Sequence, residues 1–313
     1  MRLLDVIRGP SRPTRVQLRH RRRRAGALAA VAGAALLLGM VAGARDGGGT
    51  PAVGAGATPI GWYGRLQLLA GGGRRSFAAE ERTQEGGAID RALRQTPFVR
   101  MAGAQHRLVA LTFDDGPSPY TDELVSELQR LRVPATFFVV GYQLPAFASQ
   151  LQHEVAAGMT VGDHTLDHPN LVRLSPADQR LQIVGDASKI ASFGAPLPRL
   201  FRPPYGSYDE TTHLVLGRRR MLSVLWSVDS EDYTKPGVDA IVRNVVSAVR
   251  PGYIVLMHDG GGDRAQTVAA VPRIVAALRR AGYAFASVPR LLLESPPPQD
   301  QQLPSGFNPA GAG

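Results

Sequence analysis

Hydrophobic and polar positions alternate regularly along one long stretch of the chain, residues 106–293. Short apolar runs are separated there by longer segments in which apolar residues recur with helical spacing. The runs predicted to form strands are Arg107–Phe113, Ala135–Val140, Met159–Gly162, Arg199–Phe201, Met221–Val228, Tyr253–Met257 and Phe285–Val288. The helices predicted between and after them are Thr121–Leu131, Pro145–Ala157, Pro176–Phe193, Asp209–Arg219, Asp239–Val249 and Arg264–Ala281.

Repeated strand–helix units predict a parallel sheet with helices packed outside it. Pro176 and Gly194 stand where a helix start and a helix stop are expected. Seven units are too many for a small open sheet and one short of the eight-stranded barrel. The predicted fold class is therefore α/β, a distorted (β/α)7-type barrel, with an N-terminal membrane segment and flexible tails.

The N-terminus carries the features of an exported protein. Residues 1–24 hold nine arginines and one acid, a charge of +8, and predict a basic cytoplasmic segment. Residues 25–44 are twenty uncharged residues, long enough to span a bilayer as a helix. They predict a transmembrane anchor with the patterned region 106–293 extracellular, or a signal peptide that is cleaved after Ala44 to give a secreted protein. A buried Ala-rich helix is the third interpretation.

The regions on either side of the patterned stretch have the composition of connecting chain. Residues 45–105 are Gly-rich and weakly patterned, and we expect a flexible stalk with a short helix near Ala88–Leu93. Residues 294–313 are rich in Pro, Gln and Gly, and we expect a disordered tail. The predicted folded domain is therefore 106–293.

Charge and cysteine content exclude several classes of function. The net charge of +10 is concentrated in the N-terminal segment, and the remaining chain has 27 basic and 25 acidic residues, or +2. A nearly neutral body argues against a nucleic-acid partner. The chain has no cysteine, which excludes a disulfide scaffold, a Cys-ligated zinc site, an iron–sulfur cluster and a thiol nucleophile.

Clusters of polar residues follow five of the seven predicted strands, at the strand ends where parallel α/β folds build active sites. Each cluster alone is compatible with a surface turn. Surface turns do not explain why all five clusters stand directly after predicted strands. The clusters are Thr112–Pro117 (TFDDGP), His164–His168 (HTLDH), Arg202–Gly206 (RPPYG), Trp226–Tyr233 (WSVDSEDY) and Leu256–Gly260 (LMHDG).

These residue types suit metal-assisted hydrolysis. Two adjacent carboxylates cannot face the same way on a regular strand, but the Gly-Pro turn after Asp114 and Asp115 lets both reach one centre. Two histidines four residues apart, His164 and His168, can chelate a metal from one helical turn. Two histidines and one carboxylate leave metal positions open, with another carboxylate and His258 to take and give a proton.

The order of the five motifs resembles the polysaccharide deacetylase family, whose NodB-homology domain defines carbohydrate esterase family 4. The resemblance covers about 106–293 and implies a distorted (β/α) barrel. It implies that a divalent metal, usually zinc, with cobalt, nickel or manganese as substitutes, binds to Asp115, His164 and His168. The catalytic residues it implies are Asp114 as general base, Arg202 holding that base, His258 as general acid and Asp229 orienting the acid. The substrate-binding residues it implies are Tyr205 through its backbone N–H, Leu256 at the acetyl methyl, and Pro204 and Tyr233.

The implied reaction removes N-acetyl groups from N-acetylglucosamine residues of a polysaccharide through a metal-activated water. Peptidoglycan or a chitin-like oligomer is the expected glycan partner. Tyr233 stands where the family usually has Trp, which changes the groove wall. Three alternatives remain: an O-acetyl esterase acting on xylan, a catalytically inactive glycan-binding homologue, and a non-haem iron oxygenase with the same ligand triad.

Overall fold

The computed structural model describes residues 80, 82–299 and 301. The predicted basic segment 1–24, the predicted anchor 25–44, most of the predicted stalk and residues 302–313 lie outside the described residues. Among the residues described, no helix combines the length and the apolar character needed to cross a membrane.

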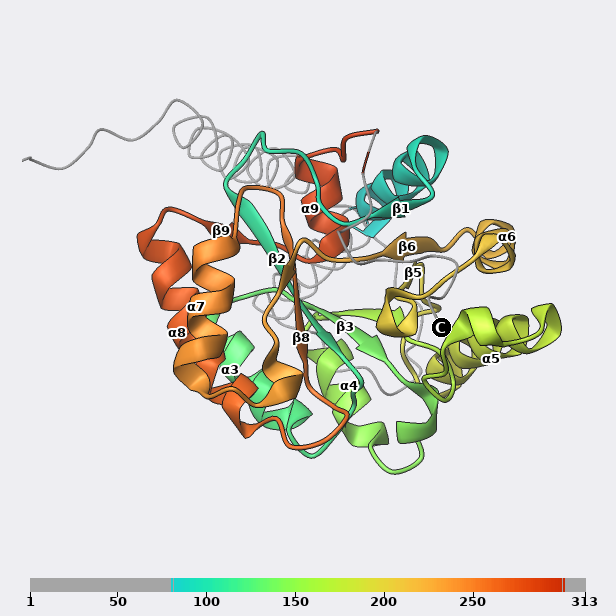
Figure 1. Ribbon diagram of the computed structural model, residues 1–313, viewed down its shortest axis with the longest axis horizontal. Coiled ribbons are helices and arrows are strands. Elements are labelled where there is room, and N and C mark those ends of the chain that lie inside the picture. Colours follow the sequence, from blue (N-terminus) through green and yellow to red (C-terminus); the bar gives the residue numbers. More distant parts are fainter. Residues whose placement is uncertain (1–79, 81, 300, 302–313) are drawn as a thin grey trace, which may run out of the picture. The chain divides into compact units, whose positions relative to one another are not determined.

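Strands and helices alternate through the described chain as the hydrophobic pattern predicts (Figure 1). The strands are β1 Phe98–Val99, β2 Leu108–Asp114, β3 Thr136–Val139, β4 Thr160–Asp163, β5 Leu200–Phe201, β6 Leu222–Val224, β7 Val228–Asp229, β8 Ile254–His258 and β9 Ala284–Phe285. The α-helices are a first helix over 82–95, then α3 Thr121–Leu131, α4 Ala148–Ala156, α5 Pro176–Ser192, α6 Glu210–Arg219, α7 Val238–Ala248, α8 Ala265–Arg280 and α9 Val288–Glu294.

The strands form one sheet in the order β1-β6-β5-β4-β3-β2-β8-β7, with β9 beside β2, and its paired strands run parallel. The two ends of this sheet approach each other. Just after β1, Met101 forms an antiparallel bridge with Tyr253, the residue before β8, and the backbone N–H of Ala102 donates to the carbonyl of Gly252 at 2.7 Å. The predicted parallel α/β architecture with barrel-like curvature is confirmed.

The alternation of side chains along β2 separates the core from the site. Val109, Leu111 and Phe113 are fully buried in the cluster that also contains residues of α3, α7 and α8. The intervening Thr112 and Asp114 point to the other face, where both bond to the guanidinium of Arg202. The apolar face of the strand therefore packs against helices, while its polar face carries the two residues that bind Arg202.

The predicted strand Met221–Val228 is split in two by the closure of the sheet. Its first half, β6, pairs with β5 and β1, whereas its second half, β7, pairs with β8 at the other end. Where β6 ends, the carbonyls of Val224 and Leu225 accept hydrogen bonds from the guanidinium of Arg202. Periodicity alone could not show this change of partner, because both halves are apolar.

The folded domain begins before the predicted boundary at residue 106. Ala88, Ile89 and Ala92 of the first helix are buried against the sheet, and β1 pairs with β6. The short helix expected in this region is present, but the sequence gives little sign of its packing, because the buried face consists mainly of two alanines. The described part of the predicted stalk from residue 82 onward is therefore part of the domain.

The domain also continues past the predicted boundary at residue 293. Ser287 caps α9 by accepting from the N–H of Arg290, and Pro289 occupies the first turn, so the predicted strand Phe285–Val288 ends early. Beyond α9, the carbonyls of Ser295 and Pro296 accept from the N–H of Gly103. These contacts correct the prediction that the chain is disordered from residue 294.

Candidate active site

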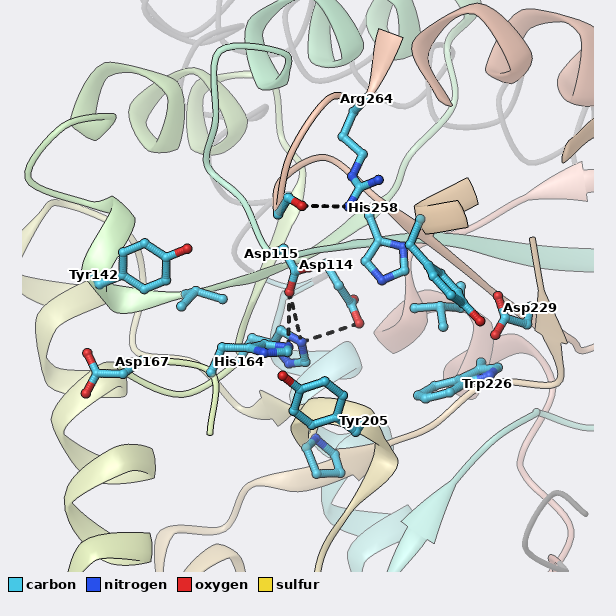
Figure 2. Close-up of a pocket in the computed structure, with 16 residues that line it drawn as sticks. Asp114, Asp115, Tyr142, His164, Asp167, Tyr205, Trp226, Asp229, His258 and Arg264 are labelled. Atoms are coloured by element: carbon cyan, nitrogen blue, oxygen red, sulfur yellow. Dashed lines mark hydrogen bonds and ion pairs between the residues drawn. The ribbon is translucent and has the colours of Figure 1, made fainter. Parts of the chain in front are cut away.

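A cavity of about 870 Å³ lies at the ends of the strands and brings all five predicted motifs together (Figure 2). Its lining includes Asp114, Asp115, His164, His168 and His258. These residues come from the ends of β2, β4 and β8, which are neighbours or near neighbours in the sheet. The predicted convergence of distant parts of the chain is therefore observed.

The two adjacent carboxylates face one centre because the chain leaves the strand between them. Asp114 is the last residue of β2, and Asp115 has a left-handed backbone with φ 72°. Asp114 Oδ2 and Asp115 Oδ1 each lie 3.6 Å from Nε2 of His164. The bend expected from the sequence at this position is thus present, and it turns both side chains toward the same imidazole.

The histidine pair converges through a turn of irregular backbone and not through a helix. Residues 164–168 carry no helical assignment, and Thr165 and His168 have positive φ angles of 73° and 57°. His168 Nε2 nevertheless lies 3.2 Å from Asp115 Oδ1, and the two imidazole rings are 4.9 Å apart. The prediction that both histidines face one site is correct, whereas the helical geometry behind it is wrong.

Asp115, His164 and His168 fit a divalent cation. Among the described residues they are the one group of three or more His, Cys, Asp or Glu side chains whose ligand atoms cluster, all within 4.8 Å of one another. Asp115 Oδ1 is buried and accepts no hydrogen bond from the described residues. An oxygen in that state needs a partner such as a cation. One carboxylate and two imidazoles form a ligand set that leaves coordination positions open.

His164 is held in the tautomer that metal binding requires. Its Nδ1 donates to the carbonyl of Arg202 at 2.6 Å, so Nε2 presents its lone pair to the two carboxylates. Burial, which outweighs the nearby charge of Asp115, lowers the pKa of His164 to about 3. The imidazole is therefore neutral at physiological pH and available as a ligand.

Arg202 holds Asp114 in place. Its side chain is fully buried, and Nη1 donates to Asp114 Oδ1 at 2.7 Å and to Thr112 Oγ1 at 2.8 Å. The guanidinium also lies 4.2 Å from the centre of the Phe138 ring. Burial raises the pKa of Asp114, and the charge of Arg202 opposes that rise. A carboxylate with a raised pKa is a stronger base than a solvent-exposed one.

His258 is oriented by Asp232, and not by Asp229 as the resemblance implied. His258 Nδ1 donates to Asp232 Oδ1 at 2.8 Å, and the backbone N–H of His258 donates to Asp232 Oδ2 at 2.8 Å. Asp229 instead lines the cavity and accepts from the N–H of Glu231. The sequence could not choose among the acids of this motif, because β7 ends at Asp229 and a short 3₁₀ turn then brings Asp232 beneath the imidazole.

The pKa of His258 is raised above its ordinary value. Burial alone would lower this pKa. The hydrogen bond and charge of Asp232, together with the charges of Asp114 and Asp115, raise it by more than burial lowers it.

The proposed role of His258 as general acid makes activity depend on this pKa. A general acid must be protonated, so activity should fall as pH rises through the pKa of His258. We expect Asp232→Asn to lower that pKa and to move the falling limb of the kcat–pH profile to lower pH. Asp229→Asn should move it less, and an unchanged limb in Asp232→Asn would refute the pairing.

Three of the four predicted substrate-binding residues line the cavity, and the fourth does not. Tyr205, Tyr233 and Leu256 line the cavity, and Tyr205 packs edge-on against His168 with ring centres 4.7 Å apart. Pro204 is buried and does not line the cavity, where its neighbour Pro203 stands instead. Tyr205 has φ 58° and ψ 12°, an uncommon backbone conformation of the kind that clusters at functional sites.

Four further polar or aromatic side chains line the cavity that the sequence alone did not identify as site residues. Trp226 belongs to the fourth motif, and Asp167 lies between His164 and His168 in the second. Tyr142 follows β3, whose end carries no recognisable polar cluster. Arg264 stands in the sequence only at the start of a predicted helix. Trp226 and Asp167 could have been found from their motifs, whereas Tyr142 and Arg264 give no distinct signal.

Comparison with known proteins identifies the family of this site. Residues 102–221 match the family model described as Polysaccharide deacetylase. A chitooligosaccharide deacetylase of Bradyrhizobium sp. (strain ANU 289) is 39% identical over 199 residues, which cover 59% of this chain and 90% of the relative. A peptidoglycan-N-acetylglucosamine deacetylase of Bacillus cereus is 36% identical over 190 residues, covering 59% and 88%. Among solved structures, a family 4 carbohydrate esterase from Streptomyces lividans in complex with acetate matches with TM-score 0.54 and 37% identity, covering 57% of this chain and 91% of that chain.

The chain belongs to the polysaccharide deacetylase family, carbohydrate esterase family 4. It is an enzyme of the hydrolase class, as the sequence predicted. Enzymes of this family generally depend on a divalent metal, and the cluster of Asp115, His164 and His168 provides a place for one.

Proposed function

We propose that the protein removes N-acetyl groups from N-acetylglucosamine residues of a cell-wall polysaccharide, with peptidoglycan as the favoured substrate. The observation that carries this proposal is that a carboxylate and an imidazole lie beside one candidate metal-binding triad in a single cavity. Asp114 Oδ2 lies 3.6 Å from His164 Nε2, and Asp114 and His258 line the same cavity as Asp115, His164 and His168 (Figure 2).

The two flanking groups divide the proton transfers of amide hydrolysis. Asp114, held by Arg202, takes a proton from the attacking water, whose oxygen forms the new bond to the acetyl carbon. His258 gives the proton from Nε2 to the sugar nitrogen as the C–N bond breaks. The products are acetic acid, which ionises to acetate, and a free amine. Asp114 then releases its proton to solvent, and the imidazole takes one up from solvent. An amide nitrogen leaves poorly unless it is protonated, so the raised pKa of His258 serves this step.

A divalent cation held by Asp115, His164 and His168, which we propose to be zinc, would polarise the acetyl carbonyl and acidify water in the site. The backbone N–H of Tyr205 is assigned to the same acetyl oxygen. The side chains of Leu256 and Trp226 form an apolar part of the wall suited to the acetyl methyl.

The walls of the cavity support a polysaccharide substrate. On one side of the triad lie Tyr142 and Asp167, and on the other lie Trp226 and Asp229 (Figure 2). Tyr233 also lines the cavity and packs edge-on against His258, with ring centres 5.5 Å apart. An aromatic face beside a carboxylate suits a sugar ring, which presents apolar C–H groups on one face and hydroxyl donors at its edge. Such pairs on both sides favour a sugar chain that continues past the target residue in both directions.

The choice of peptidoglycan rests on the N-terminal sequence. Nine arginines followed by twenty uncharged residues support a tether that holds the catalytic domain outside the membrane, or a cleaved signal that secretes it. Peptidoglycan is the N-acetylglucosamine polymer that lies next to such a membrane. A chitin-like oligomer is the second candidate within the same chemistry.

The test is acetate release by the full-length chain from three substrates: an N-acetylglucosamine pentamer, purified peptidoglycan and acetylated xylan. We expect release from the first two, loss after chelation of divalent metal, and recovery when zinc is restored. Release from acetylated xylan alone would establish the esterase alternative. Binding to the glycans with no release from any of them would establish an inactive homologue.

A further inference from the structure

We propose that Arg264 is a positioning residue for the metal site. It would fix the loop 259–263 against Asp114 and Asp115, and thereby hold the Asp115 carboxylate in the orientation that binds the cation. This inference rests on the metal site of the proposed function, but not on the identity of the glycan.

Arg264 is a buried cation whose partners are backbone carbonyls. Its side chain lines the cavity although the residue is only 4% exposed. Within the described chain it forms no ion pair with a carboxylate. Nε donates to Gly260 at 2.5 Å and Nη2 to Gly261 at 3.0 Å. Burying an unpaired charge is costly, so these contacts must be maintained by the fold around them.

The loop that Arg264 binds has little stiffness of its own. Gly261 and Gly262 have positive φ angles of 71° and 130°, which suit glycine and few other residues. Consecutive glycines leave the unfolded loop with many accessible conformations. The guanidinium of Arg264 is planar, and its donors are fixed in a single fork. By binding two successive carbonyls at once, it selects one conformation of the loop.

The same loop is in direct contact with both catalytic aspartates. The N–H groups of Asp259 and Gly260 donate to the carbonyl of Asp114 at 3.0 and 3.2 Å. A Cβ on Gly260 would overlap the carbonyl oxygen of Asp115. A Cβ on Gly261 would overlap Asp115 Oδ2 and would lie 3.3 Å from Arg264 Nη2. Gly261 therefore lies close to both the guanidinium of Arg264 and the carboxylate of Asp115.

Asp115 depends on this packing more than an ordinary ligand does. Its backbone is in the left-handed region, and Oδ1 has no hydrogen-bond partner among the described residues. The orientation of the Asp115 carboxylate is consequently set by the loop 259–263 that packs against it. Residues that orient metal ligands typically change metal affinity by about 10–100-fold when they are replaced.

The test measures metal binding directly, by competition with a chromophoric chelator, in the full-length protein. Arg264→Met should weaken the affinity for Zn²⁺ by about 10–100-fold. Arg264→Lys should lie between this variant and wild type, since it keeps the charge but loses the fork. The visible absorption of the Co²⁺-loaded Arg264→Met protein should also change, because the ligand geometry is altered. Arg279→Met is the matched control: Arg279 also donates to a backbone carbonyl, that of Leu131 at 2.6 Å, but lies outside the cavity.

A second variant keeps the proposal falsifiable if Arg264→Met does not fold. Gly261→Ala leaves the arginine in place but adds a methyl group against Asp115 Oδ2, and it should weaken Zn²⁺ binding as well. Wild-type affinity in either folded variant would overturn the inference. A wild-type protein that binds Zn²⁺ through this loop-dependent site but releases no acetate would instead overturn the proposed function and leave this inference standing.

Discussion

Replacing Asp114 by Asn should reduce acetate release by about 10²–10⁴-fold, the range that a positioned general base contributes. The amide has nearly the shape of the carboxylate but cannot take up the proton of the attacking water. Asp115, His164 and His168 are unchanged in this variant, so the affinity for Zn²⁺ should remain close to that of wild type. The measurement is kcat on an N-acetylglucosamine pentamer, combined with a metal-binding titration.

Two controls separate this effect from a general disturbance of the cavity. Asp167→Asn makes the same chemical change at a carboxylate that lines the same cavity and accepts from Gln182 Nε2 at 2.8 Å. Because we propose that Asp167 contacts the sugar and not the reacting atoms, this variant should raise KM while changing kcat little. Thermal unfolding should be measured for both variants, because Asp114→Asn leaves Arg202 without its charged partner. Wild-type kcat in Asp114→Asn would remove the proposed base from the mechanism.

Replacing Arg202 by Met should destabilise the domain by about 3–5 kcal/mol, the cost of breaking a buried ion pair by removing one partner. Asp114 would remain buried with its charge uncompensated, and the carbonyls of Val224 and Leu225 would lose their donor. The kcat for acetate release should fall as well, since Asp114 loses the guanidinium that positions it. The measurement is denaturant unfolding of the metal-free protein, followed by kcat at a temperature where the variant is folded.

A double variant tests whether the ion pair is the cause. Combining Arg202→Met with Asp114→Asn removes both charges, so the double variant should lose less stability than the sum of the two single losses. Simple additivity would mean that Arg202 stabilises the domain mainly through the backbone carbonyls and the Phe138 ring. Loss of less than about 1 kcal/mol in the single variant would contradict the buried pair altogether.

Much of this site could be predicted from sequence because strand ends are fixed by the hydrophobic pattern. The apolar runs predict where β2, β4 and β8 end, and Asp114, Asp115, His164 and His258 lie at those ends. Parallel strands then bring the ends to one edge whatever the intervening loops do. The resemblance to a family added the roles, which stay predictions. The structure shows that the three triad residues cluster and that Arg202 binds Asp114.

The errors lie in irregular backbone, which has no periodicity to reveal it. Asp232 rather than Asp229 meets His258 because a 3₁₀ turn follows a two-residue strand, and no pattern in the motif distinguishes the two aspartates. Arg264 gives no signal beyond that of a helix start, because its partners are backbone carbonyls, which carry no sequence signature. The packing of the first helix against the sheet could not be predicted, because its buried face consists mostly of alanine.

The central claim is that distant loops meet around a single cation, and X-ray diffraction at the zinc absorption edge tests it most directly. In crystals grown with Zn²⁺, we expect one strong anomalous peak about 2.0–2.2 Å from Asp115 Oδ1 and from Nε2 of both His164 and His168. Asp114 and His258 should line the cavity beside this peak without either being required to hold it. A peak elsewhere in the cavity, or none at this triad in crystals soaked to saturation, would contradict the account.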